Sequence, residues 1–212
     1  MKILSAFVLA AACVLPFYSH AAPLDDAIAE LQRDWEVIRY QTPESARLKR
    51  FEALSAKAHS FSQTFAGHSE PLVWEGIIVS SLANEKGGLG ALSLVKQAKV
   101  MYEQAIALGG DALQGSAYGS LAVLYYKVPG WPLGFGDKAK AEELLKKALS
   151  VNPSGIDPNY FYAEYLVETG RGTEATPYLE RALAAPPRPG REVADTGRRE
   201  EVRQLMAKVK AL

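Results

Sequence analysis

This 212-residue sequence has few cysteines and few histidines, and neither charge is in excess. It contains one cysteine, Cys13, and three histidines. A single cysteine forms no intramolecular disulfide and no thiolate cluster, and so few histidines leave little material for general bases or zinc ligands. The 24 basic and 24 acidic residues balance, so the basic excess typical of nucleic-acid-binding proteins is missing.

Long apolar runs are also scarce, and the one that stands out lies at the N-terminus. After Lys2, an apolar run from Ile3 to Phe17 leads to Ser19-His20-Ala21, the small-residue pattern that a signal peptidase reads. The run is shorter than the roughly 20 residues of a transmembrane helix. We therefore expect residues 1–21 to be a signal peptide cleaved after Ala21, which would leave a periplasmic or secreted chain, 22–212, with no transmembrane segment.

An alternative to this cleavage involves Cys13. The preceding Ala10-Ala11-Ala12 is a degenerate form of the small-residue sequence before a lipidated cysteine, so a membrane-anchored lipoprotein stays open. Against it, Ala10 replaces the usual leucine, and Val14-Leu15-Pro16-Phe17 continues the apolar region where a lipoprotein becomes polar. Incorporation of labelled palmitate distinguishes the two.

The sequence offers little for catalysis, metal binding or a cofactor. His20 leaves with the signal peptide, and the two remaining histidines, His59 and His68, are nine residues apart with no third metal ligand marked nearby. A Gly-x-Ser-x-Gly nucleophile motif is absent. The segment from Gly110 to Ser116 has the glycine spacing of a phosphate loop but lacks its lysine. We therefore predict no catalytic residues, no metal and no cofactor.

An internal repeat is the main feature that is present. At an offset of 34 residues, two sets match: Ala141, Leu145, Ala148 and Pro153 recur as Ala175, Leu179, Ala182 and Pro187. The spacing of four and then three residues places the small and large side chains on one helical face, and the proline follows the helix.

A second helix precedes each set and carries small and aromatic residues. These residues are Tyr118, Leu121, Ala122 and Tyr125 in one copy, and Asn159, Tyr162, Ala163 and Leu166 in the other. The combined pattern resembles the tetratricopeptide repeat, although Asn159 stands where that family prefers a large residue. The resemblance implies an all-α fold: a right-handed stack of about four helical hairpins in a single domain, clearest at 116–153 and 156–187.

Two further copies are traced toward the N-terminus. Trp74, Ile77 and Ile78 start one, which continues with Ala98, Tyr102, Ala105 and Gly110, and the other retains Trp35, Ala66 and Pro71 around helices expected near 24–40 and 43–66. After Pro187, residues 188–197 are expected to form a loop. An apolar stripe in 198–212 then predicts a C-terminal helix that caps the stack.

Helix-capping residues support these boundaries. Asp157-Pro158 and Thr42-Pro43 each combine an N-cap side chain with a first-turn proline. Asp137, after a glycine-rich segment, and Asp111, after Gly109-Gly110, are expected to cap the helices that follow them.

Two segments interrupt the repeat pattern and are expected to be long insertions. One runs from Glu85 to Leu94, and the other is 129–135, which contains Trp131 and Phe135. Helix–helix turns are normally only a few residues long. Either Trp131 and Phe135 fold back over their hairpin as part of the core, or they contact a ligand or partner at the rim.

The resemblance also implies a binding groove lined by the first helix of each repeat. The corresponding positions here are Glu75, Val79, Leu82 and Ala83, then Gly119, Val123, Tyr126 and Lys127, then Tyr160, Glu164, Val167 and Glu168. Lys127 is the one cation among them, which argues against an acidic peptide tail as ligand. Tyr faces and the Glu164/Glu168 pair favour a neutral or cationic protein or peptide, unless Tyr126 and Tyr160 simply fill the stack.

Three functions follow from these observations. The first is an exported scaffold that binds a protein or peptide in the cell envelope, with candidate contact residues Glu75, Val79, Tyr126, Lys127, Trp131, Phe135, Tyr160, Glu164 and Glu168. The second rests on a more distant similarity to the helical T component of TRAP transporters and is an accessory role in solute transport. The third, a cell-envelope enzyme, ranks last because no nucleophile, base or metal cluster is marked.

Overall fold

The computed structural model describes residues 23–211, and throughout this range it is helical with no β-strand. The α-helices are α1 (Pro23–Glu36), α2 (Glu44–Thr64), α3 (Ser69–Lys86), α4 (Gly88–Gly109), α5 (Ala112–Lys127), α6 (Lys138–Val151), α7 (Ile156–Glu168), α8 (Thr176–Ala184) and α9 (Glu192–Lys210). A π-helical turn, η1 (Val37–Gln41), extends α1, and a 3-10 turn, η2 (Gly172–Glu174), precedes α8.

The all-α prediction is confirmed, and no helix of the described range is long and apolar enough to cross a bilayer. The signal peptide and Cys13 lie outside the described residues. Their roles stay predictions, as does the right-handed tetratricopeptide type of stacking.

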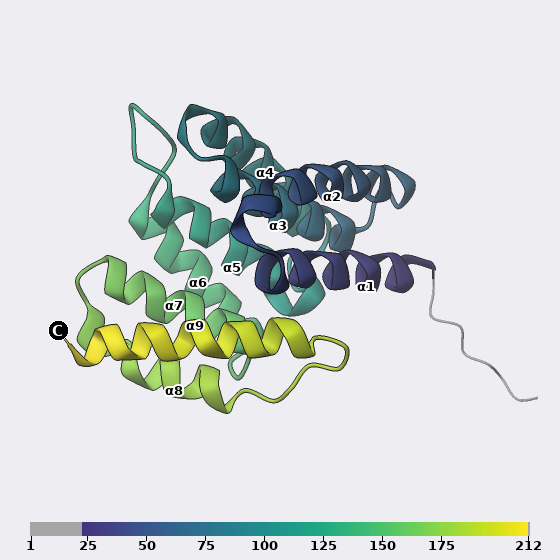
Figure 1. The fold of residues 1–212 in the computed structure, drawn as a ribbon. Coiled ribbons are helices and arrows are strands. Elements are labelled where there is room, and N and C mark those ends of the chain that lie inside the picture. Colours follow the sequence, from purple (N-terminus) through teal and green to yellow (C-terminus); the bar gives the residue numbers. More distant parts are fainter. Residues whose placement is uncertain (1–22, 212) are drawn as a thin grey trace, which may run out of the picture.

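Consecutive helices pack against each other as hairpins, most extensively α3 with α4 and α5 with α6 (Figure 1). The repeated small residues explain the close packing. Ala141 of α6 and Ala182 of α8 are fully buried, which lets neighbouring helices approach, and Leu145 and Leu179 fill the remaining space between them. The 34-residue pattern therefore lies in the core, as its spacing predicted.

The prediction of a long insertion from Glu85 to Leu94 is wrong. Helix α3 continues to Lys86, and α4 begins at Gly88, so a single residue connects them. Gly87 and Gly88 have φ angles of 62° and 57°, values that glycine adopts without a Cβ penalty. Two adjacent glycines thus reverse the chain so tightly that the rest of the segment is helical.

Only one of the four capping predictions holds. The Asp137 side chain accepts a hydrogen bond of 3.0 Å from the Lys140 amide. Asp111 and Thr42 cap nothing with their side chains; the Thr42 hydroxyl donates to the Val37 carbonyl instead. Asp157 lies inside the first turn of α7, whose N-cap is Gly155, and its carboxylate binds arginines.

Helix α9 begins at Glu192, earlier than the expected start near 198, and it does more than cover the last hairpin. It packs on α7 and α8 and also on η1, so a segment near the start of the described range contacts the last helix (Figure 1). Gly197, expected in a loop, is inside α9, where a Cβ would collide with the Tyr40 ring. The glycine is therefore a point of close helix contact.

Candidate binding sites

An open pocket of about 610 Å³ lies beside the contact between η1 and the first half of α9. Side chains from α1, α3, α5 and α7 line it together with the loop 185–191 and the start of α9. Its size falls within the range of small-molecule sites, roughly 300–1,000 Å³. The contact between α9 and η1 closes one side of it and thereby turns a concave surface into a pocket.

One part of the pocket wall is aromatic. Trp35 and Trp74 meet edge to face with ring centroids 6.0 Å apart, and Tyr102 and Phe161 add two more rings to the lining. The Trp35 Nε1–H donates to the Ser81 hydroxyl at 2.9 Å. Such a wall suits a planar apolar group, because ring faces and edges offer large contact areas with little side-chain freedom to lose.

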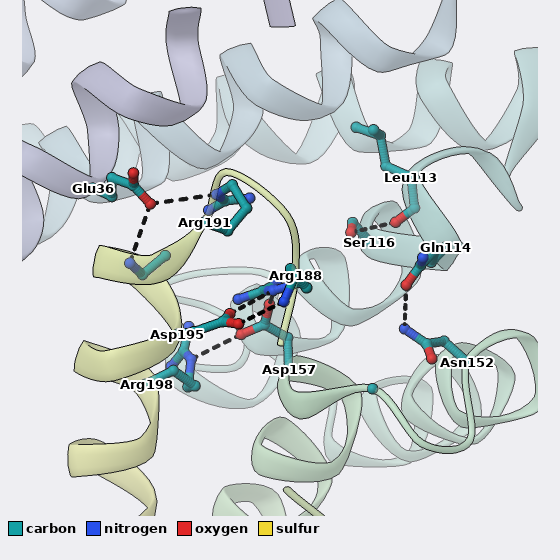
Figure 2. A network of polar contacts seen from close by, with 12 residues as sticks. Glu36, Leu113, Gln114, Ser116, Asn152, Asp157, Arg188, Arg191, Asp195 and Arg198 are labelled. Atoms are coloured by element: carbon teal, nitrogen blue, oxygen red, sulfur yellow. Dashed lines mark hydrogen bonds and ion pairs between the residues drawn. The ribbon is translucent and has the colours of Figure 1, made fainter. Parts of the chain in front are cut away.

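Another part of the wall, next to these rings, is charged (Figure 2). Arg188 donates to Asp157 at 2.6 Å and to Asp195 at 2.7 Å, and Arg198 donates to Asp157 at 2.8 Å and to Glu201 at 2.6 Å. Burial alone would raise the pKa of Asp157, but the positive charges of Arg198 and Arg188 outweigh it and hold that pKa at about 2. The network fixes the loop 185–191 and α9 to the start of α7.

Arg191 is bound differently from the other arginines of the network. Its Nε lies 3.4 Å from Glu36, which also accepts a hydrogen bond of 3.1 Å from the Ala194 amide (Figure 2). Its guanidinium lies over the Trp74 ring, 5.1 Å from the centroid. Burial, reinforced by the nearby charge of Arg188, lowers the pKa of Arg191.

A strained turn forms a third part of the lining. Leu113, Gln114 and Gly115 have φ angles of 48°, 57° and 75°, and a left-handed conformation is costly for the first two because they carry a Cβ. The Asn152 side-chain amide donates to Gln114 at 2.8 Å, and the Ser116 hydroxyl donates to the Leu113 carbonyl at 2.6 Å. Figure 2 places these groups across from the arginines.

Comparison with known proteins adds no relative. No family model matches the chain, and no curated protein matches it. Within residues 23–211, no group of three histidine, cysteine, aspartate or glutamate side chains is arranged to hold a metal ion.

The pocket lining contains none of the nine contact residues predicted from the sequence, all of which lie within the described range. Glu75 and Val79 are buried, and the Glu75 carboxylate lies 2.8 Å from His59 Nδ1. Of the other groove positions, Gly119 and Val123 do line the pocket.

The predicted residues near the end of the groove contact one another. Tyr126 is buried and donates to Glu164 at 2.6 Å, and Lys127 pairs with Glu164 at 3.2 Å and with Glu168 at 2.8 Å. Tyr160 is buried beneath Arg198 of α9, whose guanidinium is 4.6 Å from the ring centroid. These five side chains mainly serve packing between α5, α7 and α9.

The two remaining predicted residues both lie in the loop between α5 and α6, but they differ in burial. Phe135 is half-buried and packs edge to face on Tyr125, with centroids 5.7 Å apart, and the Lys99 ammonium lies 5.8 Å from the Phe135 ring centroid. Trp131 is 90% exposed and Leu133 is 72% exposed. The base of the loop is therefore held by the core while its tip projects outward.

Leu89 is a further exposed apolar side chain. It is 92% exposed at the first turn of α4, and Figure 1 shows the α3–α4 turn and the α5–α6 loop at the same end of their hairpins. We call Trp131, Leu133 and Leu89 together the apolar edge.

The sequence pattern did not place Arg188, Arg191, Asp195 or Arg198 in any site. A signal was nevertheless present, because four arginines fall between positions 188 and 199, and arginine is well suited to buried, bidentate ion pairs with carboxylates.

Proposed function

We propose that the protein is an exported helical-repeat scaffold that holds another protein in the cell envelope through the apolar edge. The single observation that carries the proposal is the exposure of Trp131, 90%, on a loop whose base is packed into the core. Exposed apolar clusters mark interaction sites, and tryptophan is among the residues that contribute most to binding at interfaces.

The conformation of the loop supports a binding role. The Gly136 amide donates to the Pro129 carbonyl at 2.9 Å, and the Asp137 amide donates to the Tyr125 carbonyl at 2.8 Å. A tip held in this way loses little conformational freedom when it binds, so more of the contact energy is retained as affinity.

Apolar contact, and not charge, is the basis of this proposal. The expectation of a neutral or cationic partner rested on Glu164 and Glu168, and both now pair with Lys127. Their charges are thereby already compensated within the chain.

Site-specific photo-crosslinking tests the proposal. A photoreactive phenylalanine analogue at position 131 should capture one defined partner in cells, and the same analogue at position 108 should not, since Leu108 is exposed elsewhere on α4. With that partner purified, Trp131→Ala should weaken binding by about 2 kcal/mol or more, whereas Leu108→Ala should leave it unchanged. Equal capture from both positions, or unchanged affinity of the Trp131→Ala variant, would reject the apolar edge as the interface.

The pocket favours a second candidate function. The distant similarity to the T component of TRAP transporters suggests an accessory role in handling a solute, and a pocket of about 610 Å³ is large enough to hold one.

A further inference from the structure

Two hydrogen-bond donors of the pocket lack an acceptor within the described residues. The first is the Nε1–H of Trp74, which is buried and bonds to no atom of residues 23–211. The second donor group is the guanidinium of Arg191, for whose terminal amino groups the same range supplies no carboxylate or carbonyl partner. A buried donor without an acceptor, such as Trp74 Nε1, costs free energy that a hydrogen bond would recover, and the Arg191 amino groups are left to bind an acceptor from outside the chain.

Both donors belong to the same corner of the pocket. Trp74 and Arg191 line it together, and the guanidinium lies over the indole ring, 5.1 Å from its centroid. The sequence separates these residues by more than a hundred positions, so the tertiary structure alone brings them together.

The surrounding charges single out Arg191 as the cation that is left to a ligand. Five arginines of the network, Arg39, Arg188, Arg191, Arg198 and Arg199, stand against four carboxylates, Glu36, Asp157, Asp195 and Glu201. Arg188 and Arg198 each contact two carboxylates at short range, whereas Arg191 has one contact of 3.4 Å. Glu36 shares its oxygen with the Ala194 amide, so the charge of Arg191 is less neutralised than the charges of Arg188 and Arg198.

The rest of the pocket defines the body of such a ligand. Trp35, Tyr102 and Phe161 provide aromatic surface, and Ile77 and Val123 add aliphatic surface to the same lining. A planar apolar group suits this wall, and Arg191, with Trp74 beside it, is placed to bind a carboxylate or a similar anionic group attached to it.

We infer that the pocket binds a small organic anion, with its anionic group on Arg191 and Trp74 Nε1 and its aromatic body between Trp35, Tyr102 and Phe161. The inference does not depend on the apolar edge, none of whose three residues belongs to the pocket lining. A free metabolite and the C-terminal carboxylate of a peptide ending in an aromatic residue share this chemistry.

Three compounds that share an indole ring and differ in charge test the inference. Indole-3-acetate is anionic, indole-3-acetamide is neutral and tryptamine is cationic. By isothermal titration calorimetry on the mature chain, we expect indole-3-acetate to bind at least about tenfold more tightly than the amide, and tryptamine to bind most weakly. Acetyl-alanyl-phenylalanine, compared with its C-terminal amide, distinguishes a peptide source from a free metabolite.

Two variants connect this preference to the proposed donors. Arg191→Gln removes the charge and should abolish the preference for the acetate, and Trp74→Phe keeps a ring but loses Nε1–H and should weaken acetate binding about threefold to tenfold. Arg203→Gln is the matched control, because Arg203 is exposed on α9 and pairs with Glu200. Thermal unfolding shows whether each variant is folded. If Arg191→Gln does not fold, the Trp74→Phe variant still tests the inference.

Several results would overturn the inference: equal affinity for the acetate and the amide, binding by no anionic probe, or a preference that survives in Arg191→Gln. None of them affects the proposed scaffold, whose crosslinking test concerns position 131 alone. Equally, a failure of the crosslinking test at position 131 does not affect the inference about the pocket.

Discussion

Asn159 departs from the repeat pattern, and its contacts explain why a large apolar residue is absent there. It is fully buried; its amide donates to the Pro153 carbonyl at 2.9 Å and to the Gly155 carbonyl at 2.8 Å. Its side-chain oxygen accepts from Arg181 at 3.0 Å. One polar side chain therefore provides donors for two carbonyl groups of the turn before α7 and also connects α7 to α8.

Replacing Asn159 by the large residue that the repeat pattern prefers should destabilise the protein. In Asn159→Leu, two carbonyls and the Arg181 guanidinium lose their partner, so we expect the free energy of unfolding to fall by about 2–4 kcal/mol. Urea denaturation followed by circular dichroism measures this. Gln97→Leu, at an exposed position of α4, should change stability by no more than about 0.5 kcal/mol. A stabilised Asn159→Leu variant would mean that the pattern outweighs the polar contacts.

Among the elements, α9 and the loop before it depend most on charge. The Asp157 carboxylate in α7 accepts hydrogen bonds from Arg188 of the loop and from Arg198 of α9. Since its pKa in the folded chain is about 2, below the usual 3.8, the carboxylate stabilises the fold fully above about pH 4. That contribution is lost as the pH falls from about 4 toward 2.

We predict that Asp157→Asn reduces the free energy of unfolding at pH 7 by about 1–3 kcal/mol, because two arginines lose their shared carboxylate. The stability of the wild type should fall between pH 4 and pH 3 more steeply than that of the variant, so the difference between them should narrow. Urea titrations at pH 7, 4 and 3 measure both effects.

Asp111→Asn serves as the control for this charge change, because Asp111 is exposed and its nearest cation, Lys147, is 3.7 Å away. It should be neutral within about 0.5 kcal/mol at each pH. A gap between the wild type and Asp157→Asn that stays constant from pH 7 to pH 3 would show that Asp157 does not titrate as described.

At the scale of the whole molecule, the contact between η1 and α9 joins an N-terminal and a C-terminal segment of the described range. Arg39 pairs with Glu201 at 2.8 Å, and the Glu36 carboxylate accepts from the Ala194 amide at 3.1 Å. Gly197 permits these contacts, because the Tyr40 ring occupies the space of a side chain. Residues on both sides of this contact, Arg39 and Tyr40 of η1 and Arg198 of α9, line the pocket.

Gly197→Ala should destabilise the closed form, although glycine to alanine inside a helix usually stabilises by about 0.5–1 kcal/mol. The added Cβ meets the body of the Tyr40 ring, so we expect a loss of about 1–3 kcal/mol. Amide hydrogen exchange should become faster in η1 and in the first half of α9 together.

Gly90→Ala is the matched helical control. The nearest atoms to a Cβ there belong to the flexible Lys86 side chain, at 3.1 Å, so its stability should be unchanged or slightly higher. If Gly197→Ala behaves in the same way, the close contact between η1 and α9 is not tight in solution.

The hairpins and their core were predictable because their signals are local. Alanine and leucine at helical spacing, repeated after 34 residues, indicate both a helix and its buried face, and Asp137 caps α6 as its position beside glycines suggested. The α3–α4 turn was missed because adjacent glycines are equally compatible with a long loop and with a one-residue reversal. Trp131 and Phe135 are close in sequence, yet one is exposed and the other half-buried, and no pattern distinguished them.

By itself, the sequence determined that the chain is helical, which faces of its helices are buried and that its hairpins follow one another. These properties depend on residues within one or two turns of each other. Only the tertiary structure decided where a ligand can bind. The packing of α9 against η1 places Arg191 over Trp74, and such a long-range contact is set by the summed packing of all nine helices of the described range and not by any periodicity along the chain.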